Sequence, residues 1–283
     1  MQAAKITFIG GGNMAAALIE GLQKNQASMM SVAQPVLVVA DPSAERRALL
    51  ADLYAVETFA DSMAAVSNAD LIVLAVKPNH VRAAAEQIRT NLSPNQLIVS
   101  VAAGITLTAL QNWLGGHQAL VRAMPNTPAM VGSGATGLCG HPALTAAQRN
   151  LAESLMRAVG LVQWVAHEAD MDAVTALSGS GPAYIFLVME AMQAAAEQLG
   201  LPAQTAKLLT LETVLGAARL AMTVDESPAQ LRARVTSPNG TTERGIAVLE
   251  QAGLRAAFAQ ALTAAHQRSV ELGVQLSEDE RAL

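Results

Sequence analysis

A glycine-rich turn close to the N-terminus has the residue types and spacing to hold a phosphate-bearing ligand. Residues 10–15 read Gly-Gly-Gly-Asn-Met-Ala and stand between an apolar run at 5–9 and a segment with helical spacing at 13–24. In a G-x-G-x-x-A turn, glycines permit the tight bend and a close approach to a pyrophosphate, and the first N–H groups of the helix face the phosphates. A glycine turn without a ligand is the alternative, but the strand–turn–helix context favours a dinucleotide site. The expected contacts are Gly10, Gly11, Gly12, Asn13, Met14 and Ala15.

Charged residues after the next apolar run bear on the choice of dinucleotide. Asp41 stands where an acid commonly bonds the ribose 2′-OH of NAD, although its distance from the glycines exceeds the usual roughly 20 residues. A loop expected at 27–34 accounts for the excess. Arg46 and Arg47 could instead meet a 2′-phosphate, or could both lie on a solvated helix face. The sequence therefore leaves NAD and NADP open.

Later apolar runs also end in residues suited to ligand binding. Lys77 follows a strand expected at 70–76, and ligands of open α/β sheets bind outside the carboxyl ends of strands. It could contact phosphate or carboxylate or relay a proton, or be an exposed loop lysine. Ala102 and Ala103 are small enough for a cofactor to lie near the backbone. Asn126 offers an amide to substrate or nicotinamide, with a simple Asx turn as the alternative.

Two turns rich in hydroxyl groups lie in the second half of the chain. Residues 178–184 read Ser-Gly-Ser-Gly-Pro-Ala-Tyr, and residues 237–242 read Ser-Pro-Asn-Gly-Thr-Thr. Each precedes or opens an expected helix, so hydroxyls and free N–H groups gather at a helix N-terminus, where an anion such as a substrate carboxylate can bind. Helix capping is the alternative, and capping and ligand binding can coexist.

The elements that position these residues change character near residue 168. Strands expected at 5–9, 35–40, 70–76, 97–101 and 120–124 alternate with helices expected at 13–24, 43–53 and 79–89. Such alternation predicts a mostly parallel, doubly wound α/β sheet of the Rossmann type. Only helices are expected afterwards, at 170–177, 182–200, 203–222, 228–234 and 242–272. We therefore predict a dinucleotide-binding domain over 1–168 and an all-α dimerisation and substrate domain over 169–283.

The segment 183–199 is apolar nearly all round, so its helix must be buried on several sides. A small helical domain cannot cover it alone, and we expect it to form a subunit interface.

Composition narrows the function classes. The 283 residues carry a formal net charge of -5 without a basic stripe, which disfavours nucleic acid as a partner. No apolar run is long enough to span a bilayer, and no signal peptide is recognisable. Cys139 is the single cysteine, which excludes an internal disulfide and a zinc cluster, and no metal site is expected. A cytoplasmic enzyme fits these features.

Five segments together resemble the pyrroline-5-carboxylate reductase family, in the family's order. They are residues 10–15, 75–78, 124–128, 177–184 and 236–242, of which 177–184 is the most specific. The resemblance implies a Rossmann domain, a helical domain that dimerises by interleaving helices, and dimers that often assemble into rings. It implies hydride transfer from NAD(P)H to the C=N bond of 1-pyrroline-5-carboxylate, giving L-proline, the last step of proline biosynthesis. NADP(H) is the expected cofactor, with NAD(H) as the alternative.

The resemblance also implies site residues. Beyond the glycine turn, Asp41 and Arg46, the expected cofactor contacts are Ser62, Ala75, Val76, Lys77, Pro78, Val101, Ala102 and Ala103. It places the substrate site near Glu168, Ser237 and Thr242, at a dimer interface. The amide and the two hydroxyl-rich turns described above add Asn126, Ser180, Gly240 and Thr241 as expected substrate contacts. Two positions depart from the family pattern, Asn239 in place of a glycine and Ser62 in place of an asparagine. Asn tolerates a left-handed backbone, so the turn at 239 can survive.

Missing acid/base patterns agree with imine reduction. No Y-x-x-x-K pair, catalytic histidine context or lysine within 182–199 is present, which disfavours alcohol and hydroxyacid dehydrogenases. A protonated imine is already electrophilic, so orientation supplies most of the effect. We expect N–H groups near Gly240 to bind the carboxylate and the Thr242 hydroxyl to contact the ring nitrogen, directly or through water. Lys77 is a second, weaker candidate for catalysis. Alternatives are a related imine or hydroxyacid reductase and a non-catalytic dinucleotide-binding sensor.

Overall fold

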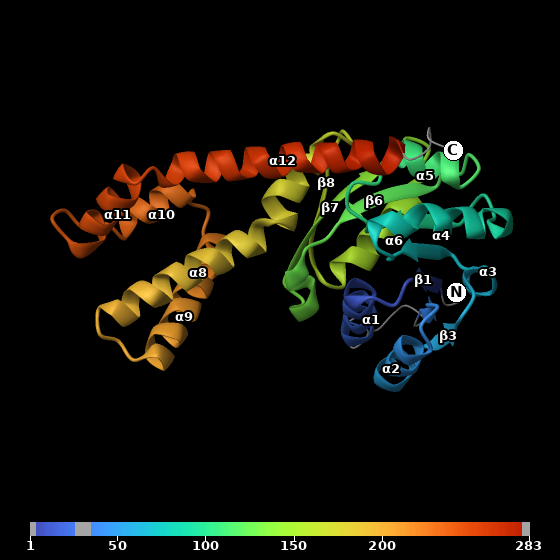
Figure 1. The fold of residues 1–283 in the computed structure, drawn as a ribbon, viewed down its shortest axis with the longest axis horizontal. Helices are drawn as coiled ribbons and strands as arrows, with labels where there is room; N and C mark the ends of the chain where they lie inside the picture. The colour runs from blue at the N-terminus through green and yellow to red at the C-terminus, as the bar shows by residue number, and fades with distance from the viewer. Residues whose placement is uncertain (1–3, 26–34, 279–283) are drawn as a thin grey trace. The chain divides into compact units, whose positions relative to one another are not determined.

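The protein is described by a computed structural model that covers residues 4–25 and 35–278 and divides into two compact units (Figure 1). Among the described residues, one unit comprises 4–25, 35–180 and 265–278, and the other comprises 181–264. The loop expected at 27–34 lies outside the described residues. The functional boundary predicted at residue 168 stays a prediction. Each unit is described by itself.

The first unit is built on one mixed sheet. Its strands are β1 (Lys5–Ile9), β2 (Val36–Ala40), β3 (Glu57–Phe59), β4 (Leu71–Leu74), β5 (Leu97–Ser100), β6 (Leu120–Met124), β7 (Gly134–Gly140) and β8 (Gly160–Trp164). They lie in the order β3-β2-β1-β4-β5-β6-β7-β8. Neighbours from β3 to β6 pair in parallel, β7 runs antiparallel to β6, and β8 is parallel to β7. The mostly parallel Rossmann architecture predicted from the sequence is thus confirmed.

Helices cover both faces of this sheet because its central strands are apolar on both sides. They are α1 (Asn13–Asn25), α2 (Ala44–Tyr54), α3 (Ser62–Ala65), α4 (Val81–Ile88), α5 (Leu107–Trp113), α6 (Ala146–Arg157) and α7 (Asp170–Val174). Side chains of α1, α2 and α6 bury one face, and side chains of α3, α4, α5 and α7 bury the other. The described part of the unit also contains the short helical turns η2 (Pro78–His80), η3 (Arg89–Asn91), η4 (Thr127–Val131) and η5 (Thr175–Gly179).

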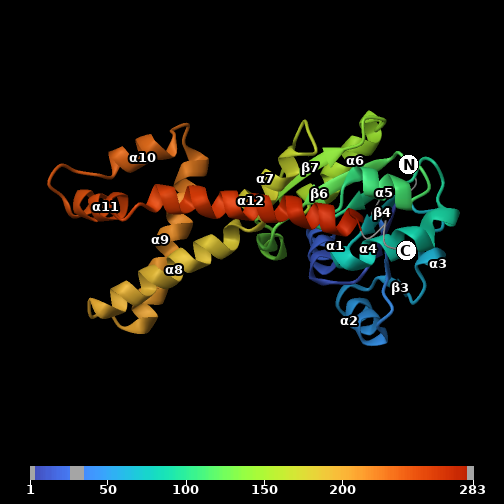
Figure 2. The same ribbon diagram turned by 45° about the horizontal axis from the view of Figure 1, so that its top comes forward.

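The second unit is helical. It holds α8 (Gly181–Gln198), α9 (Ala203–Thr223), α10 (Pro228–Arg234), α11 (Thr241–Gln251) and the first part of α12 (Leu254–Glu278). α8 and α9 lie side by side (Figure 2). The single helix expected at 242–272 is wrong, because Gly253, with φ of 77°, separates α11 from α12. Within the described residues, no helix is long and apolar enough to cross a membrane.

α8 leaves its apolar surface uncovered within this chain. None of its residues is buried, and the side chains of Phe186 and Leu187 are 61% and 65% exposed. Such a large exposed apolar face marks an interaction surface. This agrees with the subunit interface expected from the sequence.

Candidate functional site

The glycine turn bends sharply where β1 meets α1. Gly10 adopts φ of 94°, and a Cβ atom there would lie 2.9 Å from the backbone nitrogen of Val76. Its own N–H donates to the carbonyl of Ala40 at 2.8 Å. Gly12 and Asn13 are exposed at the start of α1, so the helix N-terminus is open to an anion. The backbone therefore has the shape that a pyrophosphate requires.

Asp41 and Arg46 both contact the backbone of this turn. The Oδ2 atom of Asp41 accepts a hydrogen bond from Gly11 N–H at 2.8 Å, and its Oδ1 atom accepts one from Ser43 N–H at 2.9 Å. The Arg46 Nε atom donates to the carbonyl oxygen of Gly11. Two groups able to contact a ribose or a 2′-phosphate thus lie next to the turn. Arg47 instead donates to the carbonyls of Asp41 and Pro42.

The carboxyl ends of β1, β4 and β5 form what we name the dinucleotide edge, which consists of Gly10–Ala15, Ala75–Pro78 and Val101–Ala103. Strand register places Ile9 beside Leu74, and Leu74 beside Ser100. The Ala75 N–H donates to Ile9, and the Val101 N–H donates to Leu74. Predicted cofactor residues from three separate segments are therefore brought together.

Two predicted cofactor residues, Lys77 of this edge and Ser62, follow their strands at more exposed places. Lys77 is exposed and extended, directly before the turn η2, and its side chain makes no capping hydrogen bond. Ser62 is half-buried at the first position of α3, which Asp61 caps through Met63 N–H. Because β3 lies beside β2, Ser62 follows a strand that ends at the same edge.

Asn126 finds partners inside the protein. Its Nδ2 atom donates to the carbonyl of Ser178 at 3.1 Å, and its Oδ1 atom accepts from Ala135 N–H at 2.9 Å. The Ser178 hydroxyl in turn donates to the Ala135 carbonyl at 3.3 Å. The Asn126 amide therefore joins its own loop to strand β7 and to turn η5. These contacts go beyond those of a simple Asx turn.

Glu168 belongs to an ion cluster around the buried Arg122, which sequence reasoning missed. Its Oε1 atom accepts from Leu107 N–H at 2.7 Å and from Arg122 Nη1 at 3.2 Å. The Arg122 side chain is only 5% exposed and lies 4.0 Å from Asp172, which also accepts a 2.6 Å bond from the Ser269 hydroxyl. An arginine inside the apolar run of β6 was the available signal, because a buried charge requires partners.

Cys139 lies close enough to this cluster to respond to its charge. Burial raises the pKa of the thiol, and the nearby Glu168 carboxylate raises it further. The thiol is therefore held neutral, as expected for a packed cysteine rather than a reactive one.

The second hydroxyl-bearing turn lies wholly in the helical unit. Asn239 adopts φ of 58°, the left-handed conformation that the sequence predicts, and its N–H donates to Glu243 at 2.7 Å. Gly240 is the N-cap of α11 without a side-chain cap bond. Thr241 and Thr242 are exposed in the first turn, and within the described residues their N–H groups have no partner. Ser237 precedes them in the same unit, so this turn is a candidate surface for an anion.

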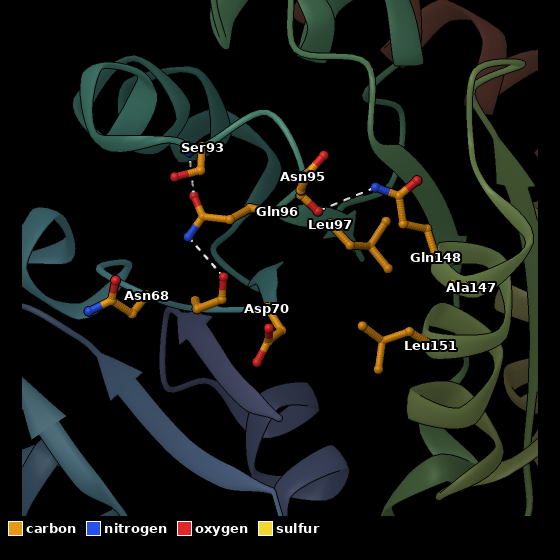
Figure 3. Close-up of a pocket in the computed structure, with 10 residues that line it drawn as sticks. Asn68, Asp70, Ser93, Asn95, Gln96, Leu97, Ala147, Gln148 and Leu151 are labelled. Atoms are coloured by element: carbon orange, nitrogen blue, oxygen red, sulfur yellow. Dashed lines mark hydrogen bonds between the residues drawn. The ribbon is translucent and has the colours of Figure 1, made fainter. Parts of the chain in front are cut away.

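A pocket of about 670 Å³ lies at the opposite edge of the sheet, before β4 and β5 (Figure 3). Buried Gln96 organises it by accepting from Ser93 N–H at 2.7 Å and donating to the Val66 and Ala69 carbonyls at 2.9 Å. Gln148 donates to the Asn95 carbonyl at 3.3 Å. The predicted site residues do not line this pocket. The amide of Gln96 already makes hydrogen bonds that hold the surrounding loops together.

Comparison with known families and proteins agrees along nearly the whole chain. Residues 168–272 match a family described as pyrroline-5-carboxylate reductase dimerisation, and residues 5–104 match one described as NADP oxidoreductase coenzyme F420-dependent. The pyrroline-5-carboxylate reductase of Pseudomonas aeruginosa is 49% identical over 278 residues, covering 98% of this chain and 100% of that protein. The Pasteurella multocida enzyme is 40% identical, covering 96% of this chain and 98% of that protein.

Solved structures extend the likeness. A pyrroline-5-carboxylate reductase from Coxiella burnetii superposes with a TM-score of 0.89 at 48% identity, covering 96% of this chain and 99% of that one. The Plasmodium falciparum pyrroline carboxylate reductase, solved with NADP bound, gives a TM-score of 0.83 at 27% identity with the same coverage. The glycine turn and the dinucleotide edge beside it agree with this near full-length similarity, and the chain belongs to the pyrroline-5-carboxylate reductase family.

Proposed function

We propose that the protein reduces 1-pyrroline-5-carboxylate to L-proline with NADPH, the last step of proline biosynthesis. The observation that carries the proposal is near full-length similarity to reductases of this name in a chain that retains an open glycine turn. In the reaction a hydride adds to the carbon of the C=N bond, and the ring nitrogen ends as an amine.

The residues around the turn fit a nicotinamide dinucleotide. Gly10 leaves no room for a side chain, and the first N–H groups of α1 are open to a pyrophosphate. Arg46 provides a half-buried cation for a 2′-phosphate, which supports NADP(H) over NAD(H). The bound cofactor would supply the hydride. The proposed contacts are Gly10, Gly11, Gly12, Asn13, Met14, Ala15, Asp41, Arg46, Ser62, Ala75, Val76, Lys77, Pro78, Val101, Ala102 and Ala103.

The turn before α11 is the proposed site for the substrate carboxylate. Open N–H groups at the start of this helix suit an anion, and the Thr242 hydroxyl can contact the ring nitrogen and pass it a proton directly or through water. Lys77 is the second proposed catalytic residue. The other residues proposed for the substrate site are Asn126, Glu168, Ser180, Ser237, Gly240 and Thr241.

Self-association through the helical unit is part of the proposal. The exposed apolar face of α8 and the match of residues 168–272 to a dimerisation family support a dimer. Assembly of dimers into a ring, a cytoplasmic location and the absence of a nucleic-acid partner stay predictions from the sequence.

The test adds pyrroline-5-carboxylate to the protein with NADPH or NADH and monitors oxidation of the cofactor as loss of its near-ultraviolet absorbance. We expect proline to form with both cofactors at different rates, NADPH faster. NADPH binding without oxidation would contradict the proposal and favour a related imine reductase or a non-catalytic sensor. A panel of cyclic imines and hydroxyacids run beside it separates those two.

A further inference from the structure

We propose that Asn126 is a positioning residue. Through Ser178 it fixes the turn that presents the Ser180 hydroxyl beside the carboxyl end of β6. The inference rests on the proposed function, because Ser180 is taken to contact the substrate. All the residues concerned lie in the first unit.

The amide of Asn126 is engaged on both sides. Its oxygen accepts from Ala135 N–H at 2.9 Å, and its nitrogen donates to the carbonyl and, at 3.4 Å, to the hydroxyl of Ser178. The Ser178 hydroxyl closes the ring by donating to Ala135. A side chain bonded in this way is already satisfied within the protein, so its natural effect on a ligand is through the segment that it holds.

That segment has an unusual backbone. Thr175–Gly179 forms a π-helical turn, in which the Ser180 N–H donates to the Thr175 carbonyl five residues back at 2.9 Å. π-helical turns are rare and concentrate at functional sites. Because they close less favourably than an α-helix, an outside contact must hold them. Asn126 provides such a contact at Ser178, the fourth residue of the turn.

Packing fixes the end of the same turn. A Cβ atom on Gly179 would lie 2.5 Å from the Cε atom of Met124, the last residue of β6. The turn therefore rests directly on the carboxyl end of β6, which pairs in parallel with β5 of the dinucleotide edge.

Ser180 is the group that this arrangement presents. Its side chain is half-buried, and its hydroxyl has no hydrogen-bond partner among the described residues. By contrast, the hydroxyls of Ser178 and Thr175 both donate to carbonyls, of Ala135 and Met171 respectively. Ser180 thus keeps a free donor and acceptor for the carboxylate or ring nitrogen of a small substrate.

Steady-state kinetics of the full-length enzyme test the inference with Asn126→Asp, Ser180→Ala and the double variant. An aspartate at 126 can still accept from Ala135 N–H, but it places a carboxylate oxygen against the Ser178 carbonyl and so releases the turn. We expect the KM for pyrroline-5-carboxylate to rise about three- to tenfold in either single variant, the loss that one hydrogen bond predicts. The KM for NADPH should stay near wild type, and the melting temperature of Asn126→Asp should fall by only a few degrees, because the part-buried Ser178 carbonyl loses its donor.

The double variant separates positioning from a structural role. If Asn126 acts through Ser180, the double variant should be no worse than Ser180→Ala alone, because the two losses are not additive. Asn112→Asp, at an exposed asparagine of α5, is the control for the new charge and should match wild type.

Two results would overturn the inference alone. These are an unchanged substrate KM in Asn126→Asp, or a rise in the NADPH KM as large as the rise in the pyrroline-5-carboxylate KM together with additive effects in the double variant. A wild-type enzyme that does not oxidise NADPH would instead overturn the proposed function, and this inference with it.

Discussion

At the scale of single residues, Gly10 shows how backbone geometry limits the sequence. It combines a positive φ with a backbone neighbour that a Cβ would touch, whereas Gly115 has φ of 68° and nothing within 4 Å of a Cβ. Alanine at Gly115 would cost only the free energy of a left-handed backbone, whereas alanine at Gly10 would add a steric clash with Val76. Comparing the two positions therefore separates these two costs.

We expect Gly10→Ala to lower the free energy of unfolding by about 2–3 kcal/mol and to weaken NADPH binding at least tenfold. The left-handed backbone costs about 1–2 kcal/mol by itself, and the contact with Val76 adds to it. Urea unfolding and NADPH fluorescence titration measure the two effects. Gly115→Ala is the control and should lower stability by about 1 kcal/mol while binding NADPH normally. Equal effects of the two variants would show that the collision is unimportant.

Thr242 is the residue on which the proposed chemistry depends. We expect Thr242→Ala to lower turnover about a hundredfold, because a positioned proton donor typically contributes at least that much. Affinity for NADPH should not change. Stopped-flow kinetics of pyrroline-5-carboxylate reduction measures turnover, and titration with NADPH measures cofactor affinity. Thr263→Ala removes a similar exposed threonine hydroxyl from α12 and should behave like wild type. Normal turnover in Thr242→Ala would remove this residue from the mechanism.

Much of the candidate site could be predicted at this scale, and the reason is local. The bend of the glycine turn and the places of Asp41 and Lys77 at the ends of apolar strands follow from short stretches of sequence, so they can be predicted from local motifs. The engagement of Asn126 with Ser178, 52 residues away, and of Arg122 with Glu168, 46 residues away, depends on strand register and was not readable.

At the scale of elements, strands that are buried on both faces were the easiest to predict. β1, β4 and β5 are continuous apolar runs, and all were placed within about two residues. β7 was missed because its sequence, Gly-Ala-Thr-Gly-Leu-Cys-Gly, lacks the usual strand composition. Its glycines are required by packing, since a Cβ on Gly137 would lie 2.6 Å from Val174.

The exposed face of α8 gives a prediction at the same scale. We expect Phe186→Asp to shift the protein from dimer or larger assembly to monomer, because a desolvated carboxylate opposes burial of that face. Light scattering after size-exclusion chromatography measures the mass. Leu53→Asp places the same charge on a leucine of α2 that is 62% exposed and should leave the assembly intact. An unchanged mass in Phe186→Asp would remove α8 from the interface.

At the scale of the whole molecule, stability should depend on the protonation of His117. Burial lowers the pKa of this histidine below 6.5, although its bond to the Gln96 carbonyl opposes part of the shift. The unfolded chain therefore binds a proton more readily than the folded one. Stability should fall as pH falls below about 6.5 and level off below the folded-state pKa.

Urea midpoints between pH 7.5 and pH 5 check this dependence. His117→Gln should flatten the part of the decline that this residue contributes. His266→Gln, at an exposed histidine of α12, is the control and should keep the wild-type profile. If both variants follow the wild-type curve, His117 does not govern the decline.

α12 gives the molecule an order of assembly during synthesis. Its residues 265–278 belong to the first unit, where Leu276 and Gly273 cover Gly104 and Ser269 bonds Asp172. After the last strand of the sheet has been synthesised, the ribosome must add about a hundred further residues before this part of α12 is made. Until then, Gly104 and the Asp172 carboxylate stay uncovered on the newly made sheet. A chain that ends after residue 264 would therefore have an incomplete nucleotide-binding unit, and the quality-control system of the cell would recognise it as incompletely folded.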